Sequence, residues 1–187
     1  MEILEVTEEH AAAWDEFVLA APEATFYHQY KWKTALEQAY KLRPHYRIAM
    51  QGQQVRGVLP LAEVRSLRGS RSLVSTPFAN YGGVLADDDE VAAALLAHGH
   101  SLIDTLQARR LEFKSLCQAE HAELAELLEY FSLVLNLDAD PEVVWKGEFN
   151  AKVRNQVRKA EKNGVTVEAG IEHFQSFIDI LRLNLRD

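Results

Sequence analysis

The segment PHYRIAMQGQQVRGVLPLAEVRSL, residues 44–67, determines the fold class of this chain. It contains two apolar stretches typical of β-strands, joined at residues 51–53 (QGQ), where the glycine favours a tight turn. We therefore predict a β-hairpin here. A second turn at residues 68–70 (RGS) leads into RSLVSTPF, residues 71–78, which we predict to be a third strand that breaks at Pro77.

The segments on either side of these strands include predicted helices. Apolar residues recur at helical spacing in HAAAWDEFVLAA, residues 10–21, and in FYHQYKWKTALEQAY, residues 26–40. Residues 91–110 are predicted to form a long helix, and the acidic residues 87–89 suit its positive N-terminus. This order of elements predicts an α+β or mixed α/β domain.

The C-terminal part of the chain is predicted to alternate strands and helices. Strands are expected at residues 111–116, 131–138 and 165–170, a short helix at 122–130, and an amphipathic helix at 171–187. Pro141 is expected to open a helical stretch that continues to residue 162, because Asn163 and Gly164 form a good helix stop. No terminator follows the last helix, which suggests a cut rather than a natural end.

The bulk composition is that of a globular protein with an acidic surface. Hydrophobic residues make up 48% and charged residues 26% of the 187 residues, and the formal net charge is −8. This acidic balance argues against a protein that coats nucleic acid, so any contact with a polyanion must be local. No signal peptide is visible, and no apolar run approaches the ~20 residues that span a bilayer. We therefore expect a cytoplasmic protein without a transmembrane segment.

Positive charge is concentrated in FNAKVRNQVRKAEKNG, residues 149–164. Five basic side chains and one acidic one give this window +4, so the rest of the chain sums to −12. Arg154, Arg158 and Lys162 fall at positions i, i+4 and i+8 of a predicted helix, and Lys152 and Lys159 flank them. Guanidinium groups at this spacing suit phosphate or carboxylate. The alternative is an ordinary solvated helix face.

Two further segments are candidates for binding. In PFANYGG, residues 77–83, the paired glycines permit close backbone approach, and Asn80 and Tyr81 present polar groups beside them; a tight connection between strands is the alternative. In FYHQYKW, residues 26–32, aromatic side chains surround His28 and Gln29. Such aromatics are usually part of the core, and a lone histidine has no visible catalytic partner.

Several kinds of active site leave no trace in the sequence. It contains no GxSxG, Walker or GxGxxG motif, and the histidines show no metal-ligand spacing, so we predict no metal. The segment RSLRGS, residues 65–70, has basic residues and a glycine, but a strand follows it. It therefore cannot form the phosphate cradle of a helix N-terminus. No catalytic residue can be named.

The motifs resemble those of the FemAB-related proteins, the aminoacyltransferases of peptidoglycan bridge formation and their relatives in exopolysaccharide or exosortase gene neighbourhoods. The resemblance is carried by YHQYKW, VRGVLPLAEV, LVSTPFANYGGVLAD, LEFKSL and KVRNQVRKAEKNGVTVEAG. Its most specific parts are GVLPL followed by PFxNYGG, and the RxxxRKAxKxG helix. Family members are about twice this length, and the chain resembles only their N-terminal half.

The resemblance implies a GNAT-like α/β fold, with a mixed central sheet flanked by helices. Residues 1–140 would form a first GNAT-like domain, and residues 141–187 the basic helix and the beginning of an incomplete second unit. In the family, the acyl donor is an aminoacyl-tRNA in the well-studied branch, and an acyl-CoA is the other possible donor here. The acceptor is an amine on a nucleotide-linked or lipid-linked precursor. No cofactor is expected in this chain.

The resemblance also gives the candidate segments a ligand. It implies that Gln29, Trp32, Asn80 and Tyr81 line the wall of a precursor-binding cleft. It also implies that the basic residues of the window 149–164 bind a phosphate of the precursor or of a tRNA end. These residues are Lys152, Arg154, Arg158, Lys159 and Lys162.

Three functions remain open. The first is an N-acyltransferase of cell-envelope, peptidoglycan or exopolysaccharide synthesis, acting with a second half. The second is a binding module that grips a phosphorylated glycan or a protein partner without turnover. A reading frame that continues beyond Asp187 into a second GNAT-like half would favour the enzyme. A stand-alone coenzyme-A acetyltransferase is a third, weaker option.

Overall fold

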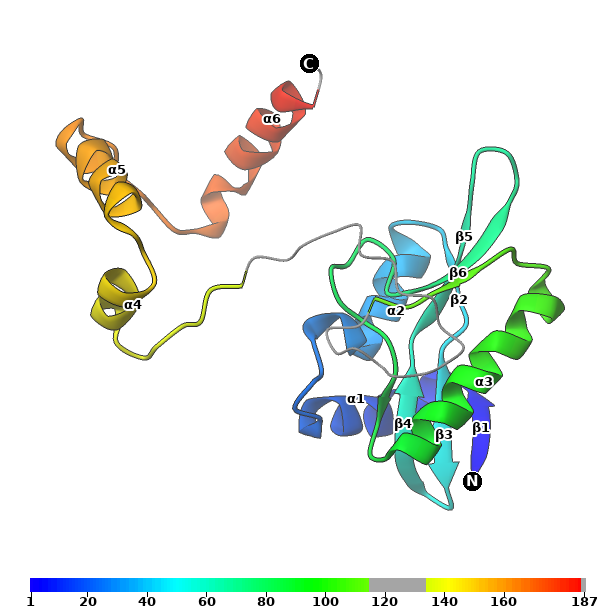
Figure 1. The fold of residues 1–187 in the computed structure, drawn as a ribbon. Coiled ribbons are helices and arrows are strands. Elements are labelled where there is room, and N and C mark those ends of the chain that lie inside the picture. Colours follow the sequence, from blue (N-terminus) through cyan, green and yellow to red (C-terminus); the bar gives the residue numbers. More distant parts are fainter. Residues whose placement is uncertain (115–133, 186–187) are drawn as a thin grey trace. The chain divides into compact units, whose positions relative to one another are not determined.

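The computed structural model describes residues 1–114 and 134–185 (Figure 1). The chain divides into two compact units, Met1–Ala125 and Glu126–Asp187, and each is considered by itself. The helices of the first unit are α1 (Ala11–Ala20), α2 (Tyr30–Gln38) and α3 (Asp89–Leu106), with short 3-10 turns η1 (Glu8–His10) and η2 (Phe26–His28). Its strands are β1 (Glu2–Glu5), β2 (Arg43–Pro44), β3 (Arg47–Gln51), β4 (Gln54–Leu59), β5 (Leu61–Arg65), β6 (Arg71–Ser75), β7 (Leu85–Ala86) and β8 (Leu111–Glu112).

One long bent hairpin, formed by β2 to β5, is shared between two four-stranded sheets. The sheets have the orders β1-β3-β4-β7 and β2-β5-β6-β8. Arg47 lies opposite Leu59 in the first sheet. Pro44 lies opposite Ala62 in the second, so the same antiparallel register continues across the bend.

The bend explains where the structure departs from the predicted hairpin. The second strand of the hairpin is interrupted at Pro60, between β4 and β5, because proline has no N–H to donate to a ladder. The expected central sheet therefore becomes two sheets joined through the hairpin. Both predicted turns hold a glycine in the left-handed region, with φ +64° at Gly52 and +80° at Gly69.

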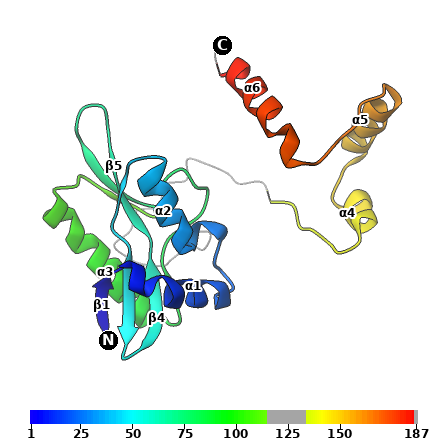
Figure 2. The ribbon, with the colours of Figure 1, turned by 180° about the vertical axis from the view of Figure 1, so that it is seen from behind.

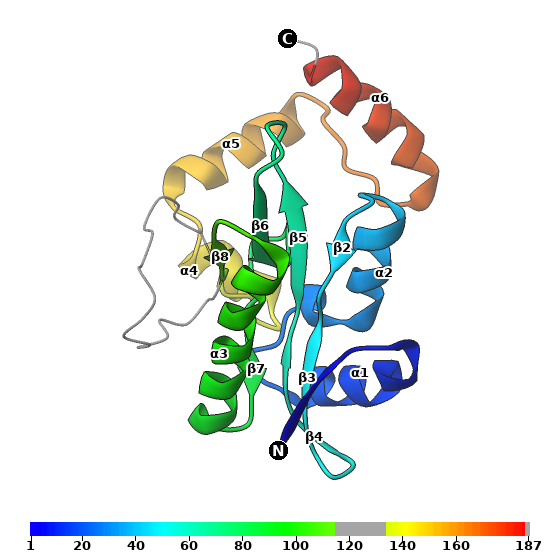
Figure 3. The ribbon, with the colours of Figure 1, turned by 90° about the vertical axis from the view of Figure 1, so that its right-hand side faces the viewer.

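The hydrophobic core lies on both faces of the first sheet. In β3, Ile48 packs into the cluster that includes α1, whereas its neighbour Ala49 packs into the cluster that includes α3. In β4, Val58 packs into the cluster that includes α1 and Leu59 into the cluster that includes α3. Successive side chains of a strand point to opposite faces, so this split is expected. Figure 3 shows α3 on one side of the strands and α1 and α2 on the other, and Figure 2 shows α1 beside β4.

The second sheet contains a parallel pair. β6 runs parallel to β8, with Leu73 opposite Leu111, and α3 provides the connection that a parallel pair requires. The predicted helix at residues 91–110 is confirmed as α3. β8 is shorter than the strand predicted at residues 111–116, and residues 115 and 116 lie outside the described part of the chain.

The second unit, as far as it is described, is helical. Its elements are α4 (Pro141–Gly147), α5 (Ala151–Lys162), η3 (Ile171–His173) and α6 (Phe174–Asn184). The predicted continuous helix from Pro141 is wrong, because Asn150 caps a new helix by accepting a hydrogen bond from the N–H of Val153 at 3.0 Å.

The strands predicted for this unit are not observed in its described residues. Residues 134–138 and 165–170 form no strand, and they are mostly exposed. The helix predicted at residues 122–130 and the start of the strand predicted at 131–138 lie outside the described residues. The predicted boundary after residue 140 falls within the second unit, and the GNAT-like character of residues 141–187 stays a prediction. None of the described helices combines the length and the apolar character that crossing a bilayer requires.

Candidate functional site

The candidate site of the first unit lies where the parallel strands β6 and β8 end. Ligands of α/β sheets bind outside the carboxyl ends of parallel strands. Here the loop of residues 76–83 follows β6 and is bonded to the end of β8. The N–H of Gly82 donates to the carbonyl of Lys114 at 2.5 Å, and the N–H of Lys114 donates to Oγ of Ser75 at 2.9 Å. The chain's own loop therefore occupies the ends of these strands.

This loop has a strained backbone. Thr76 and Phe78 both have left-handed conformations, with φ +47° and +63°. A left-handed backbone costs an L residue about 1–2 kcal/mol, and it is an outlier for a β-branched residue such as threonine. Thr76 is fully buried, and its hydroxyl donates to the carbonyl of Tyr81 at 3.0 Å. Such strain persists only where the surroundings enforce it, and it clusters at functional sites.

The buried side chain of Thr76 requires a glycine at position 82, the first of the adjacent pair. A Cβ on Gly82 would lie 1.9 Å from Oγ1 of Thr76, so no larger residue fits without movement. The sequence prediction that paired glycines serve close backbone approach is thus explained at Gly82. Thr76 and Gly82 belong to the same loop. Their contact therefore fits the alternative interpretation of this segment, a tight connection between strands.

His28 lies beside this loop. It is 1% exposed, and its Nδ1 accepts a hydrogen bond from the N–H of Thr25 at 3.0 Å, so the proton of the neutral ring sits on Nε2. No hydrogen bond of ordinary geometry reaches that Nε2 among the described residues, although the backbone of Gly83 lies beside the ring. Burial lowers the pKa of His28, and the backbones of Thr25 and Gly83 oppose the lowering only in part. The structure thus holds a neutral, buried N–H donor next to the glycine pair.

The predicted residues Gln29 and Trp32 lie at the start of α2. Gln29 is half-buried at the N-cap of this helix, without a side-chain cap bond. The half-buried ring of Trp32 packs edge-on against Phe26 and Tyr27, with ring centroids 6.1 and 5.1 Å apart. Its Nε1 is buried without a hydrogen-bond partner among the described residues.

The predicted residues Asn80 and Tyr81 lie on the strained loop. Asn80 is exposed, and Tyr81 is half-buried and uses its carbonyl within the loop. The structure brings the two predicted segments together where His28 meets Gly83. Outside the first segment, the ring of Tyr40 stacks on Phe78. Among the described residues, no hydrogen bond or aromatic pair joins Gln29 or Trp32 to Asn80 or Tyr81.

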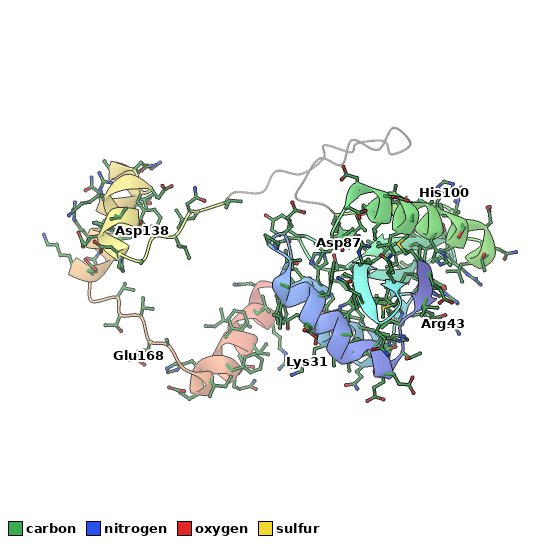
Figure 4. The ribbon with its side chains drawn as sticks, turned by 90° about the horizontal axis from the view of Figure 1, so that it is seen from below. Lys31, Arg43, Asp87, His100, Asp138 and Glu168 are labelled. Carbon is green, nitrogen blue, oxygen red and sulfur yellow. The ribbon has the colours of Figure 1, made fainter. Side chains whose placement is uncertain are left out.

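The N-terminus of α3 is closed to anions by acidic residues. The side chain of Asp88 caps the helix by accepting a hydrogen bond from the N–H of Val91 at 2.8 Å. Arg56 pairs with Asp87 and Asp88 at 2.5 and 2.7 Å, and Asp87 is labelled in Figure 4. A helix N-terminus is a natural phosphate site, but this one is already neutralised by carboxylates.

The basic residues of the second unit lie on α5, which ends at Lys162 as the Asn163-Gly164 stop predicts. Arg154 donates to the carbonyls of Trp145 and Phe149, so it helps to close the end of α4. The other basic residues of α5 are exposed, namely Lys152, Arg158, Lys159 and Lys162. Within residues 134–185, none of the five forms an ion pair with a carboxylate.

Sequence reasoning missed several residues of the first site. It set His28 aside for lack of a partner, and it did not consider Thr76 or Lys114. The loop residues beside His28 and Lys114 lie far away in the sequence, with Gly83 beside His28 and Ser75 and Ala79 bonded to Lys114, so no local pattern could reveal them. No group of three or more His, Cys, Asp or Glu side chains in the described parts of the chain could hold a metal ion.

Comparison with solved structures identifies the fold. A transcriptional regulator from Bacillus halodurans C-125 has a TM-score of 0.51 at 11% identity, over 73% of this chain and 99% of that one. A ribosomal-protein-alanine N-acetyltransferase from Brucella melitensis biovar Abortus 2308 has a TM-score of 0.50 at 10% identity, over 73% and 100%. The fold is GNAT-like.

The structure of FemX is also similar. It has a TM-score of 0.45 at 17% identity, over 58% of this chain. The match spans only 25% of the FemX chain. No family model matches the sequence, and no curated protein matches it either.

Proposed function

We propose that the chain is part of an N-acyltransferase of cell-envelope biosynthesis, which acylates an amine of a peptidoglycan or exopolysaccharide precursor. The observation that carries the proposal is the GNAT-like fold, with a strained loop and a buried donor at the ends of its parallel strands. The cell-envelope role rests on the resemblance of the sequence motifs to the FemAB-related proteins. We place the reaction in the cytoplasm.

In this proposal, the acyl donor is an aminoacyl-tRNA rather than an acyl-CoA. Two features of the first unit support this choice. The carboxylate-capped N-terminus of α3 does not suit the pyrophosphate of coenzyme A, and the loop of residues 76–83 fills the ends of β6 and β8. The first unit would therefore bind the acceptor, and no cofactor would be bound here.

The chemistry requires positioning more than a catalytic side chain. The acceptor amine would attack the carbonyl carbon of the aminoacyl ester. The amide bond forms as the ester bond breaks, and the tRNA hydroxyl leaves with the proton that the amine loses. Holding an amine against an activated ester supplies much of the rate enhancement. Gln29, Trp32, Asn80 and Tyr81 are the proposed positioning residues.

The exposed cations of α5 would bind phosphate. Lys152, Arg158, Lys159 and Lys162 are the proposed contacts, because each is exposed without a carboxylate partner in the described second unit. The phosphate would belong to the precursor or to the tRNA end. Arg154 would hold the helix in place through its carbonyl contacts.

The test is an acyl-transfer assay on the protein encoded by the complete reading frame. It is incubated with a nucleotide-linked or lipid-linked amine acceptor and with either radiolabelled aminoacyl-tRNA or acyl-CoA. The proposal predicts label in the acceptor with aminoacyl-tRNA and none with acyl-CoA. Label from neither donor would contradict it.

A binding module remains the second candidate, and one observation favours it. The loop that fills the ends of β6 and β8 leaves the strand ends bonded to the protein itself. A protein that only grips a phosphorylated glycan needs no opening there. Binding of the acceptor without turnover, by the complete protein with either donor, would support this candidate.

A further inference from the structure

The turn between β5 and β6 holds an apolar residue in full contact with water. Figures 1 and 2 show the hairpin of these strands extending past the rest of the first unit. The N–H of Gly69 closes the turn by donating to the carbonyl of Ser66 at 2.9 Å, so Leu67 and Arg68 occupy its two central positions. Leu67 is exposed to 109% of its reference area. Turns normally hold glycine, proline or polar residues, and folding buries none of this leucine.

Arginines gather around the base of this hairpin. In register, Arg65 of β5 lies opposite Arg71 of β6, and the N–H of Arg109 donates to the carbonyl of Arg71 at 2.9 Å. Arg43 of β2, labelled in Figure 4, lies opposite Glu63 of β5. Six of the eight arginines in residues 1–114 therefore lie at this end of the second sheet, namely Arg43, Arg65, Arg68, Arg71, Arg109 and Arg110.

Few carboxylates balance these arginines. Buried Glu63 pairs with Arg65 at 2.5 Å, and Glu112 pairs with Arg110 at 3.1 Å. Asp104, in the last turn of α3, is the third carboxylate at this end of the sheet. Six arginines against three carboxylates leave a local charge of +3, in a chain whose net charge is −8. This end of the first unit is therefore a positive patch on an acidic protein.

The arginines without a carboxylate are available to an outside partner. Arg43, Arg68 and Arg109 are exposed and have no carboxylate partner within residues 1–114. An apolar tip with cations beside it suits a lipid surface, where leucine enters the interface and guanidinium groups stay at the level of the phosphates. Recognition of RNA uses aromatic side chains for stacking, and residues 65–71 contain none.

We propose that the β5–β6 turn docks on a membrane surface that contains anionic lipid. Leu67 enters the interface, and Arg68 contacts the headgroup phosphates, with Arg43 and Arg109 adding attraction from behind the turn. Each arginine near an anionic membrane surface strengthens binding by about fivefold. The inference goes beyond the proposed acyl transfer and does not depend on it, because it concerns where the protein is held.

The experiment measures sedimentation of the full chain with vesicles of equal parts phosphatidylcholine and phosphatidylglycerol, beside vesicles of phosphatidylcholine alone. We expect binding to the mixed vesicles only, and weaker binding as salt rises. Arg68→Gln should weaken it about fivefold. Leu67→Ser should weaken it about tenfold, because the buried apolar area is lost. Both side chains are exposed in the folded chain, so thermal melts should not change.

The matched control is Leu19→Ser in α1, where the leucine is also exposed, at 73%. It should leave vesicle binding unchanged, because Leu19 lies outside the arginine patch. The proposal is overturned if the chain does not bind the mixed vesicles, if it binds both kinds equally, or if Leu67→Ser and Arg68→Gln bind like the wild type. Binding of tRNA in place of the vesicles, weakened by the same two substitutions, would also overturn it, because the turn would then be an RNA contact.

Discussion

Gly82 tests how tightly the strained loop is packed. A Cβ at this position would lie 1.9 Å from Oγ1 and 2.7 Å from Cγ2 of buried Thr76. We therefore expect Gly82→Ala to lower the free energy of unfolding by about 1–3 kcal/mol, the usual cost of overpacking. Denaturant titration measures this change. The control is Gly147→Ala, where a Cβ meets no atom within 4 Å, and equal stability losses in the two variants would contradict the packing described.

His28 gives the protein a predictable dependence on pH. Its folded pKa is lowered by burial from the ordinary value of 6.5, so the unfolded chain takes up a proton more readily. The stability is complete above about pH 6.5 and falls as the pH drops toward the lowered folded pKa. The slope cannot exceed about 1.4 kcal/mol per pH unit for this one group.

The measurement is the free energy of unfolding at pH 7.5 and pH 5.5. The His28→Gln variant should lose less stability on acidification than the wild type. Burial also lowers the pKa of His45 and His98, so some dependence should remain in the variant. An identical loss in both proteins would show that His28 is not a buried neutral group.

Sequence patterns indicated the glycine pair but not the residues that surround it. The segment PFANYGG stood out because its glycines are adjacent, and the structure gives Gly82 a steric reason. His28 gave no signal, because its neighbour Gly83 belongs to a different segment. The left-handed backbone of Thr76 contradicts its local preference and is held by a long-range bond from its N–H to the carbonyl of Pro60 at 3.3 Å. That of Phe78 belongs to a local turn, in which the N–H of Ala79 bonds to the carbonyl of Thr76 at 3.2 Å.

At the scale of elements, α5 carries one cation with a structural role and several exposed cations. Arg154 donates to carbonyls near the end of α4, whereas Arg158 is exposed and has no partner in the described second unit. We expect Arg158→Ala to weaken binding of a pyrophosphate-bearing ligand by about 1.5–3 kcal/mol, with little change in stability. The affinity should also fall as salt rises.

The matched variant is Arg154→Ala, which should instead reduce the protection of α4 amides from hydrogen exchange. Binding at two ionic strengths and hydrogen exchange together distinguish the two roles. If Arg158→Ala leaves the affinity unchanged but lowers the melting temperature, the basic face of α5 is only a solvated surface.

The elements also show what periodicity can and cannot predict. Local patterns predicted three features. Strand-like apolar stretches indicated the hairpin of β2 to β5, acidic residues at the N-terminus indicated α3, and a helix stop indicated the end of α5. Residues 134–138 and 165–170 are apolar enough for strands, but within the described second unit they have no strand to pair with. Strand formation depends on such neighbours more than on local preference.

At the scale of the whole molecule, the closed N-terminus of α3 predicts how the protein responds to coenzyme A. Asp88 caps the helix, and Asp89 and Glu90 occupy its first turn. We expect no heat on calorimetric titration of this chain with acetyl-CoA, because the anion would meet carboxylates. Saturable binding in the micromolar range would contradict this account of the first unit.

The central claim is that the complete protein joins an acyl group to an amine of a cell-envelope precursor. The most direct measurement is the mass of the acceptor after incubation with the complete protein and aminoacyl-tRNA. The account predicts an acceptor heavier by one aminoacyl residue, and no such product when the tRNA is first digested with ribonuclease. An acceptor of unchanged mass, under conditions where the protein binds both substrates, would contradict it.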